Sequence, residues 1–162
     1  LFRRSSQDTR TTEERALDHI RAWHGNYSDW TIRIYRTKRG FRLLVTHALF
    51  NPTAEAVQQV MQDLGVDNRY RLLCGAQSCF RARLTPKPWR VRLKRPSVRY
   101  PWETPQQELI QREWEETYHQ TIGNCAVCTL VETLGTTQAH LEAKQITEIH
   151  DGYVLAANKP LA

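Results

Sequence analysis

Residues 30–49 read WTIRIYRTKRGFRLLVTHAL, and this stretch decides the fold because apolar and polar side chains alternate along it. Ile32 and Ile34 fall on one side of an extended chain, whereas Arg33 falls on the other. A Lys-Arg-Gly turn follows, in which Gly40 can take the positive φ that a tight hairpin requires. The second half returns as a partner strand. The stretch therefore predicts a half-buried β-hairpin.

Helical patterns lie on both sides of this hairpin. Thr11 or Thr12 can cap a first helix, and Pro105 suits the first turn of a later one. Helices are expected at 12–23, 54–64, 68–78 and 104–119. Strands are expected at 90–93, as an edge strand, at 125–134 and at 141–155, although the first residues of the last stretch also fit a helix.

This order of elements predicts an α+β domain, with a mainly antiparallel sheet and helices packed on one face. The other face of such a sheet would stay open to a ligand. The 162 residues suit one domain at 12–155, preceded by a flexible N-terminal arm at 1–11 and followed by a C-terminal tail at 156–162.

Composition narrows the class of protein. Hydrophobic residues make up 40% of the chain and charged residues 25%, as in ordinary globular proteins. No apolar run approaches the ~20 residues of a membrane helix, and no cleavable signal pattern is visible. We therefore expect a cytoplasmic protein. The chain begins with Leu, which indicates a processed piece and leaves an upstream segment open.

Residues 80–102, FRARLTPKPWRVRLKRPSVRYPW, form the most biased segment, which we call the basic segment. It holds eight Lys or Arg, four prolines and no Asp or Glu, so it carries +8 while the whole chain carries +6. Positive charge concentrated in one segment, with aromatic rings between the charges, is typical of a polyanion-binding surface. Nucleic acid is the commonest polyanion, and single strands or RNA suit the exposed rings.

In extended chain, Arg81 and Arg83 point to one side about 7 Å apart, which roughly matches successive phosphates of a single strand. Arg90 and Arg92 have the same spacing. The alternative is that these arginines pair with the glutamates at 113, 115 and 116, and that the tryptophans are core. The candidate phosphate- and base-binding residues are Arg33, Tyr35, Arg42, Arg81, Arg83, Lys87, Trp89, Arg90, Arg92, Lys94, Arg95, Arg99 and Tyr100.

The four cysteines form a second candidate site, for a metal ion. Cys74 and Cys79, together with Cys125 and Cys128, form two pairs that could supply four thiolates to a structural Zn²⁺. Buried core thiols are the alternative, because the residues between Cys125 and Cys128 are apolar and free cysteine is commonly buried. No other cofactor is expected.

No catalytic residue stands out. His150 and Asp151 resemble the metal-binding dipeptide of HD-type phosphohydrolases, but the further ligands of such a site are missing and the surrounding residues look extended. His47 is best explained as a structural residue at the core edge. Phosphate loops, dinucleotide fingerprints, nucleophile elbows and paired strand carboxylates are all absent from the sequence.

The stretches RIYRTKRGFRLLVTH and CFRARLTPKPWR resemble a pattern found in uncharacterised bacterial proteins. The hairpin is also similar to that of primase-polymerase domains, and Thr37, Gly40 and Arg42 occupy the corresponding places. The chain has Arg42 where that family has a histidine, and no acidic pair precedes the turn. The resemblance therefore implies contact with nucleic acid or nucleotide rather than polymerase activity.

Two further hypotheses stay open beside nucleic-acid binding. One is an enzyme or nucleotide-binding protein whose phosphate pocket is lined by Arg33, Arg42, Arg81 and Arg83, with His47 as acid or base. The other is a subunit of a larger assembly that docks on an acidic protein partner through the basic segment.

Overall fold

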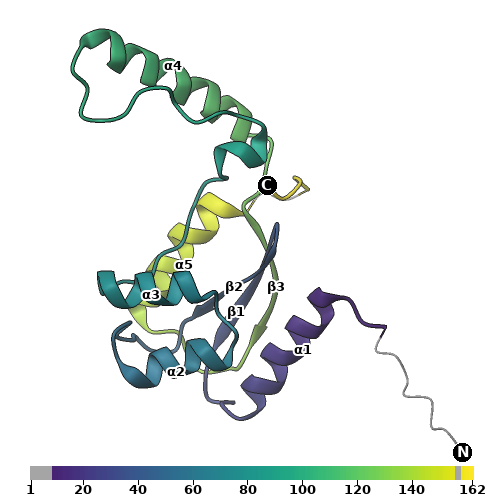
Figure 1. Ribbon diagram of the computed structural model, residues 1–162. Coiled ribbons are helices and arrows are strands. Elements are labelled where there is room, and N and C mark those ends of the chain that lie inside the picture. The colour runs from purple at the N-terminus through teal and green to yellow at the C-terminus, as the bar shows by residue number, and fades with distance from the viewer. Residues whose placement is uncertain (1–8, 156–157) are drawn as a thin grey trace, which may run out of the picture.

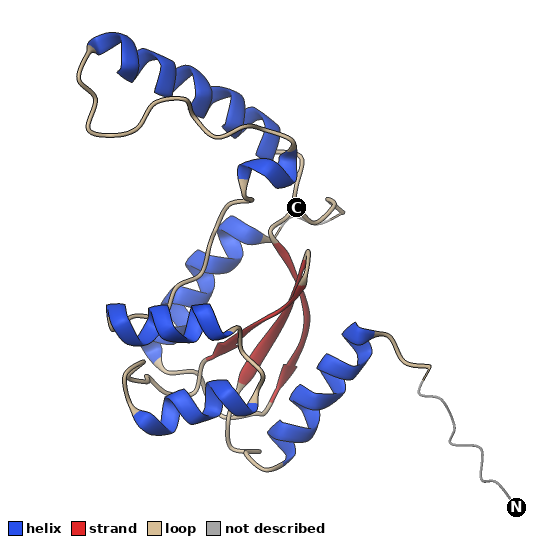
Figure 2. Ribbon diagram, in the orientation of Figure 1, coloured by secondary structure: helices blue, strands red, loops and turns tan. Residues whose placement is uncertain are grey.

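The computed structural model describes residues 9–155 and 158–162 (Figure 1). Residues 1–8 of the expected N-terminal arm and residues 156–157 of the expected tail lie outside the described residues. None of the described helices is both long enough and apolar enough to cross a membrane. Five α-helices and three strands build the described chain, which confirms the α+β class (Figure 2).

The expected hairpin forms the centre of the sheet. β1 (Ile32–Thr37) pairs with β2 (Gly40–Val45) through a two-residue turn, and β3 (Cys128–Leu134) pairs with the other edge of β1. The strand order is β2-β1-β3. Both pairings are antiparallel, which agrees with the predicted mainly antiparallel sheet. A bulge in β3 lies opposite the Ile34–Tyr35 step, where the register passes from Glu132 to Leu130.

One face of the sheet is covered by α1 (Thr12–Gly25), which begins with a complete capping box between Thr11 and Glu14. Ile20 and Trp23 of α1 pack on Ile32 and Ile34 of β1 and form the larger buried cluster. The end of α2 (Glu55–Asp63) contributes Val60 and Leu64 to the edge of the same cluster.

The opposite face of the sheet is covered by α5 (Leu141–Val154), on the far side from α1 in Figure 1. The prediction of a strand at 141–155 is therefore wrong, and this face is not open to a ligand. Ala143, His150 and Val154 are the buried residues of α5, and their spacing has the period of a helix. Val154 packs with Tyr35 and Cys128 in the second buried cluster.

Beyond the helix that follows α2, the chain leaves the body of the molecule and then returns to β3 (Figure 1). α3 (Asn68–Gln77) follows α2, the basic segment then contains one 3₁₀ turn, η1 (Pro88–Val91), and α4 (Pro105–Ile122) leads back. The prediction of an edge strand at 90–93 is wrong, because Pro88 begins this turn and Arg92 ends it in the left-handed region, at φ 61°. The helices at the other expected positions are confirmed within a few residues.

Candidate nucleic-acid interface

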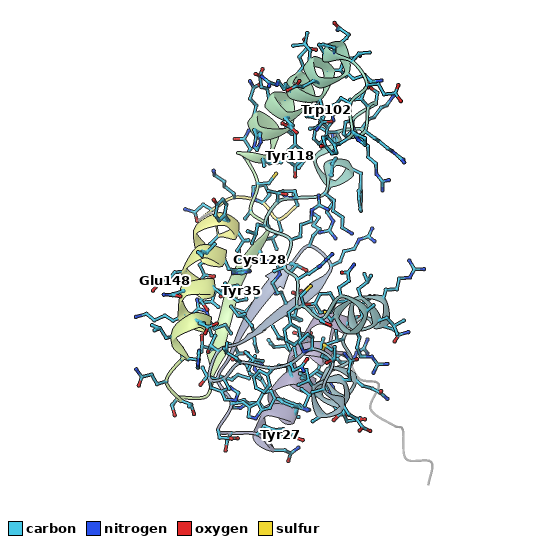
Figure 3. All side chains as sticks on the ribbon, turned by 90° about the vertical axis from the view of Figure 1, so that its left-hand side faces the viewer. Tyr27, Tyr35, Trp102, Tyr118, Cys128 and Glu148 are labelled. Carbon is cyan, nitrogen blue, oxygen red and sulfur yellow. The ribbon has the colours of Figure 1, made fainter. Side chains whose placement is uncertain are left out.

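The basic segment and α4 together form an arm that projects from the sheet (Figure 1). Two rings of α4 hold the segment: Trp114 Nε1 donates to the Lys94 carbonyl at 2.9 Å, and the Tyr118 hydroxyl donates to the Pro86 carbonyl. These rings stack with their centroids 5.0 Å apart. Figure 3 shows Tyr118 and Trp102 together in the arm. The helix therefore supports a segment whose prolines prevent it from forming regular structure of its own.

The charges of the basic segment are largely exposed and uncompensated. Its cationic side chains comprise six exposed ones (Arg81, Arg83, Arg92, Lys94, Arg95 and Arg99) and two half-buried ones (Lys87 and Arg90). Within residues 9–155 and 158–162, no Asp or Glu forms an ion pair with any of these eight. Two acids of α4 have partners within the helix, since Glu115 accepts from Gln111 and Glu108 from Arg112. The alternative that the arginines pair with α4 is thus not supported by the described contacts.

Two aromatic side chains of the basic segment reach solvent. Trp89 is 54% exposed and carries the Lys87 ammonium 4.7 Å from its ring centroid. Tyr100 is 81% exposed and meets the half-buried Trp102 edge-on at 5.5 Å. Exposed rings beside cations can stack on unpaired bases while the cations contact the phosphates.

The hairpin candidates do not extend this surface. Tyr35 is fully buried, and Arg33 donates from Nε to the Tyr35 hydroxyl at 2.7 Å and from Nη2 to Asp151 at 2.6 Å. Arg42 donates from Nη1 to His150 Nε2 at 2.7 Å and from Nη2 to the Arg83 carbonyl at 2.9 Å. These residues instead form a polar network beneath α5. We call Arg33, Tyr35, Arg42, His150 and Asp151 the polar network.

Asp151 is the acceptor at the centre of the polar network. Its Oδ1 accepts from the Tyr35 hydroxyl at 2.8 Å and from His150 Nδ1 at 2.9 Å. Burial alone would raise the pKa of Asp151, but these hydrogen bonds and the charge of Arg33 outweigh burial and lower its pKa. Asp151 therefore stays ionised and compensates the charge of the Arg33 guanidinium.

Burial raises two other pKa values beneath α5. It raises the pKa of Tyr35 to about 12, although the charge of Arg33 acts in the opposite direction. It raises the pKa of the Cys128 thiol to about 11. Both groups are therefore held neutral and protonated by the folded state over the neutral range.

Stability is expected to fall at alkaline pH because of Tyr35. A pKa raised on folding contributes stability that is complete below pH 10, the ordinary tyrosine value, and is lost as pH rises to about 12. Tyr35→Phe should be less stable than wild type at pH 7. Between pH 10 and about pH 12, its free energy of unfolding should fall by roughly 2 kcal/mol less than that of wild type. Urea denaturation across this range measures the difference. Tyr153→Phe, at a residue 69% exposed, serves as the control and should follow wild type; parallel curves for wild type and Tyr35→Phe would contradict the assignment.

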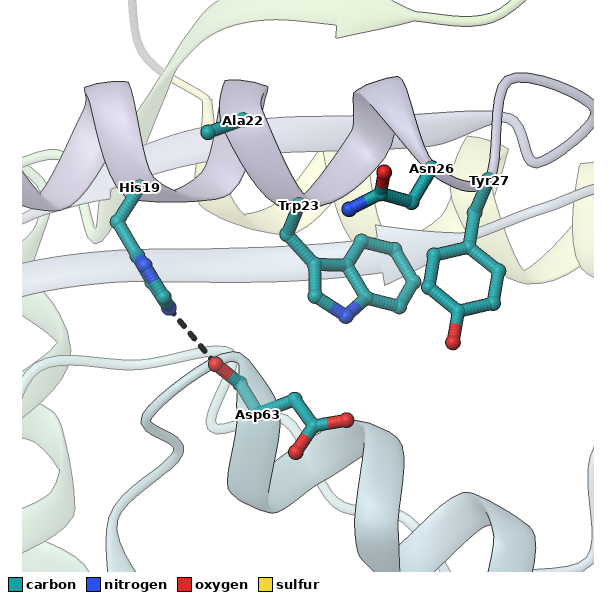
Figure 4. A pocket seen from close by; sticks show the side chains of 6 residues that line it. All are labelled: His19, Ala22, Trp23, Asn26, Tyr27 and Asp63. Carbon is teal, nitrogen blue, oxygen red and sulfur yellow. Dashed lines mark hydrogen bonds between the residues drawn. The ribbon is translucent and has the colours of Figure 1, made fainter.

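An arginine-lined phosphate pocket does not form from the expected residues. Arg33 and Arg42 are occupied by the polar network, and His47 accepts from the Thr31 amide at 3.3 Å while its ring packs between Trp30 and Phe50. A cavity of about 560 Å³ lies between α1 and α2 (Figure 4). Its lining consists of His19, Ala22, Trp23, Asn26, Tyr27 and Asp63, and includes none of these arginines.

The four cysteines are free thiols placed on different parts of the fold. Cys74 is buried in α3 and Cys128 is buried in β3, whereas Cys79 and Cys125 are half-buried in connections. The described part of the chain contains no group of three or more His, Cys, Asp or Glu side chains arranged to hold a metal ion. The zinc hypothesis stays a prediction without structural support.

Sequence reasoning missed the contribution of α5 to the polar network. The pair His150 and Asp151 is visible in the sequence, but a strand at 141–155 would turn them to opposite faces. On a helix both can reach the sheet, and the helical spacing of Ala143, His150 and Val154 is the signal that could have revealed this. The chain matches no protein-family model, no curated protein and no solved structure.

Proposed function

We propose that the arm binds single-stranded nucleic acid, with the phosphates on the cations of the basic segment and unpaired bases on Trp89 and Tyr100. One observation carries this proposal: eight cations lie on one extended segment, and none is paired with an Asp or Glu of the described chain. A surface that only stabilised the fold would leave so many like charges uncompensated at an electrostatic cost.

The arrangement favours a single strand over a duplex. Exposed rings gain stacking energy only from bases that are not already paired and stacked. The helix of the arm presents acidic residues, Glu113, Glu115 and Glu116, which the phosphates flanking a major groove would repel. RNA and DNA single strands share the phosphates and base faces that this surface would contact. The four free thiols suit a reducing compartment, so the setting we propose is the cytoplasm.

Loss of a stacking ring provides the direct test. Tyr100→Ala should weaken binding of a labelled 20-nucleotide single strand roughly 5- to 150-fold, because base–aromatic stacking contributes about 1–3 kcal/mol. Fluorescence anisotropy at constant salt measures the affinity. Binding of inorganic polyphosphate, which has charges but no bases, should be unaffected by the same substitution.

Tyr153→Ala is the matched control, because Tyr153 is an exposed tyrosine on α5 and lies outside the arm. It should bind like wild type. Wild type could instead bind the oligonucleotide and polyphosphate equally well, with no effect of Tyr100→Ala. That result would show a surface that recognises negative charge alone and would favour an acidic protein as the partner. Absence of binding to both would overturn the proposal.

A further inference from the structure

The contacts of His150 within the polar network select one tautomer of its neutral ring. Its Nε2 lies 2.7 Å from Arg42 Nη1, and a guanidinium can only donate, so Nε2 must carry a lone pair. The ring proton is then on Nδ1, where it donates to Asp151 Oδ1 at 2.9 Å. His150 is 4% exposed, so water cannot readily replace either partner. The neutral Nδ1–H tautomer is the form that satisfies both contacts.

Arg42 connects this histidine to the basic segment. The guanidinium lies between two acceptors, His150 Nε2 on α5 and the Arg83 carbonyl at the root of the segment, 2.9 Å away. Leu84, the next residue, packs beside the buried cluster of Tyr35 and Val154. The root of the segment is therefore held against the sheet where the polar network meets it, although Arg42 and Arg83 are 41 residues apart.

We propose that His150, through Arg42, is a positioning residue for the root of the basic segment, and that protonation of His150 releases this contact. A protonated imidazole carries an N–H on Nε2, so a donor would face the donor of Arg42 and two positive charges would meet at hydrogen-bond distance. Arg42 must then turn away from His150, and the guanidinium that holds the Arg83 carbonyl moves with it. Among side chains with unperturbed pKa values, histidine is the one whose charge changes between about pH 5 and pH 8.

The charged and titratable groups around His150 determine how its ring responds to a change in pH. β1 contributes Tyr35, whose ring lies 4.7 Å from the imidazole, and Arg33; β2 contributes Arg42; β3 contributes the Cys128 thiol; and α5 contributes Asp151. Asp151 is the one group in this set that attracts a proton to His150. It already accepts from Arg33 and Tyr35, so its charge is shared. Arg42 opposes protonation from the other side of the ring.

Nuclear magnetic resonance tests the proposal without any ligand. At pH 8 the ¹⁵N shifts of His150 should show the Nδ1–H tautomer, and a dominant Nε2–H tautomer would overturn the proposal. As pH falls to 5, the backbone amides of Arg81, Arg83 and Leu84 should shift together with the His150 ring. Amides that stay still while the ring titrates would also overturn it.

Two variants separate His150 from other titrating groups. His150→Gln can still accept from Arg42 but does not titrate, so the joint shift of the root amides should disappear. His19→Gln, at an exposed histidine whose Nε2 contacts the Asp63 carbonyl at 2.7 Å on the far side of the sheet, should leave that shift intact. A shift that persists in His150→Gln would assign it to another group and refute the role of His150.

The consequence for binding rests on the proposed function. If the segment binds a single strand, its affinity should be measured at pH 5.5 and at pH 7.5 in wild type and in His150→Gln. The ratio of the two affinities should differ about tenfold between the two proteins, which corresponds to the loss of one charge-assisted hydrogen bond. Amides that titrate as expected in a chain that binds no oligonucleotide would support the positioning role and reject nucleic-acid binding. Equal ratios in the two proteins, with binding intact, would show that the root contact does not control affinity.

Discussion

Affinity for a single-stranded oligonucleotide is expected to fall about 2,000-fold when monovalent salt rises from 50 to 200 mM. Each phosphate contact releases counterions and contributes about 0.7 to the slope of log affinity against log salt for single strands. Eight contacts, one for each cation of the basic segment, give a slope of about −5.6. Anisotropy titrations at four or five salt concentrations measure this slope directly. A flat response would contradict nucleic-acid binding by this segment.

Half of these contacts can be removed without disturbing the core. Replacement of the exposed side chains Arg92, Lys94, Arg95 and Arg99 by glutamine should halve the slope and reduce the same fall in affinity to about 50-fold. The matched control removes four exposed charges outside the arm, at Arg15, Lys38, Arg69 and Lys144. That control should keep the full slope. Equal slopes in the two variants would indicate a response to net charge and not to the basic segment.

Gly135→Ala is expected to give the largest loss of stability from a single methyl group. Gly135 follows β3 with φ +80°, and an added Cβ would lie 2.0 Å from the Trp30 carbonyl oxygen and 2.9 Å from its carbon. The neighbour in contact is backbone at the start of the hairpin, which cannot move without shifting the register of the sheet. Left-handed strain costs about 1–2 kcal/mol and overpacking about 1–3 kcal/mol, so a loss of about 3 kcal/mol or more is expected.

Urea denaturation of the variant measures this loss. Gly152→Ala is the matched control, because Gly152 lies in α5 and no atom lies within 4 Å of the added Cβ. That substitution should leave stability unchanged or raise it by up to about 1 kcal/mol, since alanine favours a helix over glycine. A Gly135→Ala protein as stable as wild type would mean that β3 does not approach the hairpin in this way.

The elements that the sequence predicts correctly are those specified by neighbouring residues. Alternation along residues 32–37 and a turn ending at Gly40 define the hairpin. Threonine caps begin α1 and α4, and Asp67 caps α3. In each cap the side chain accepts a hydrogen bond from a backbone amide three residues further along the chain. Such contacts need no distant part of the chain, so the sequence contains the information that sets them.

The candidate site divides in the same way. The charge of the basic segment follows from composition, because no acid lies within it to compensate the eight cations. Separation of Arg33 and Arg42 from that surface does not follow from composition. Both carry the same charge as their neighbours, and only the partners brought by α5, more than 100 residues away, turn them inward.

The sequence by itself determined the hairpin, the helix beginnings and the positive charge of residues 80–102. The tertiary structure decided that residues 141–154 form a helix, that this helix closes the second face of the sheet, and that α4 supports the basic segment as an arm. The physical reason is the range of the interactions. Caps, turns and alternation act over a few residues, whereas the contacts of Asp151 with Arg33 and Tyr35 span 118 and 116 residues and exist only after the chain has folded.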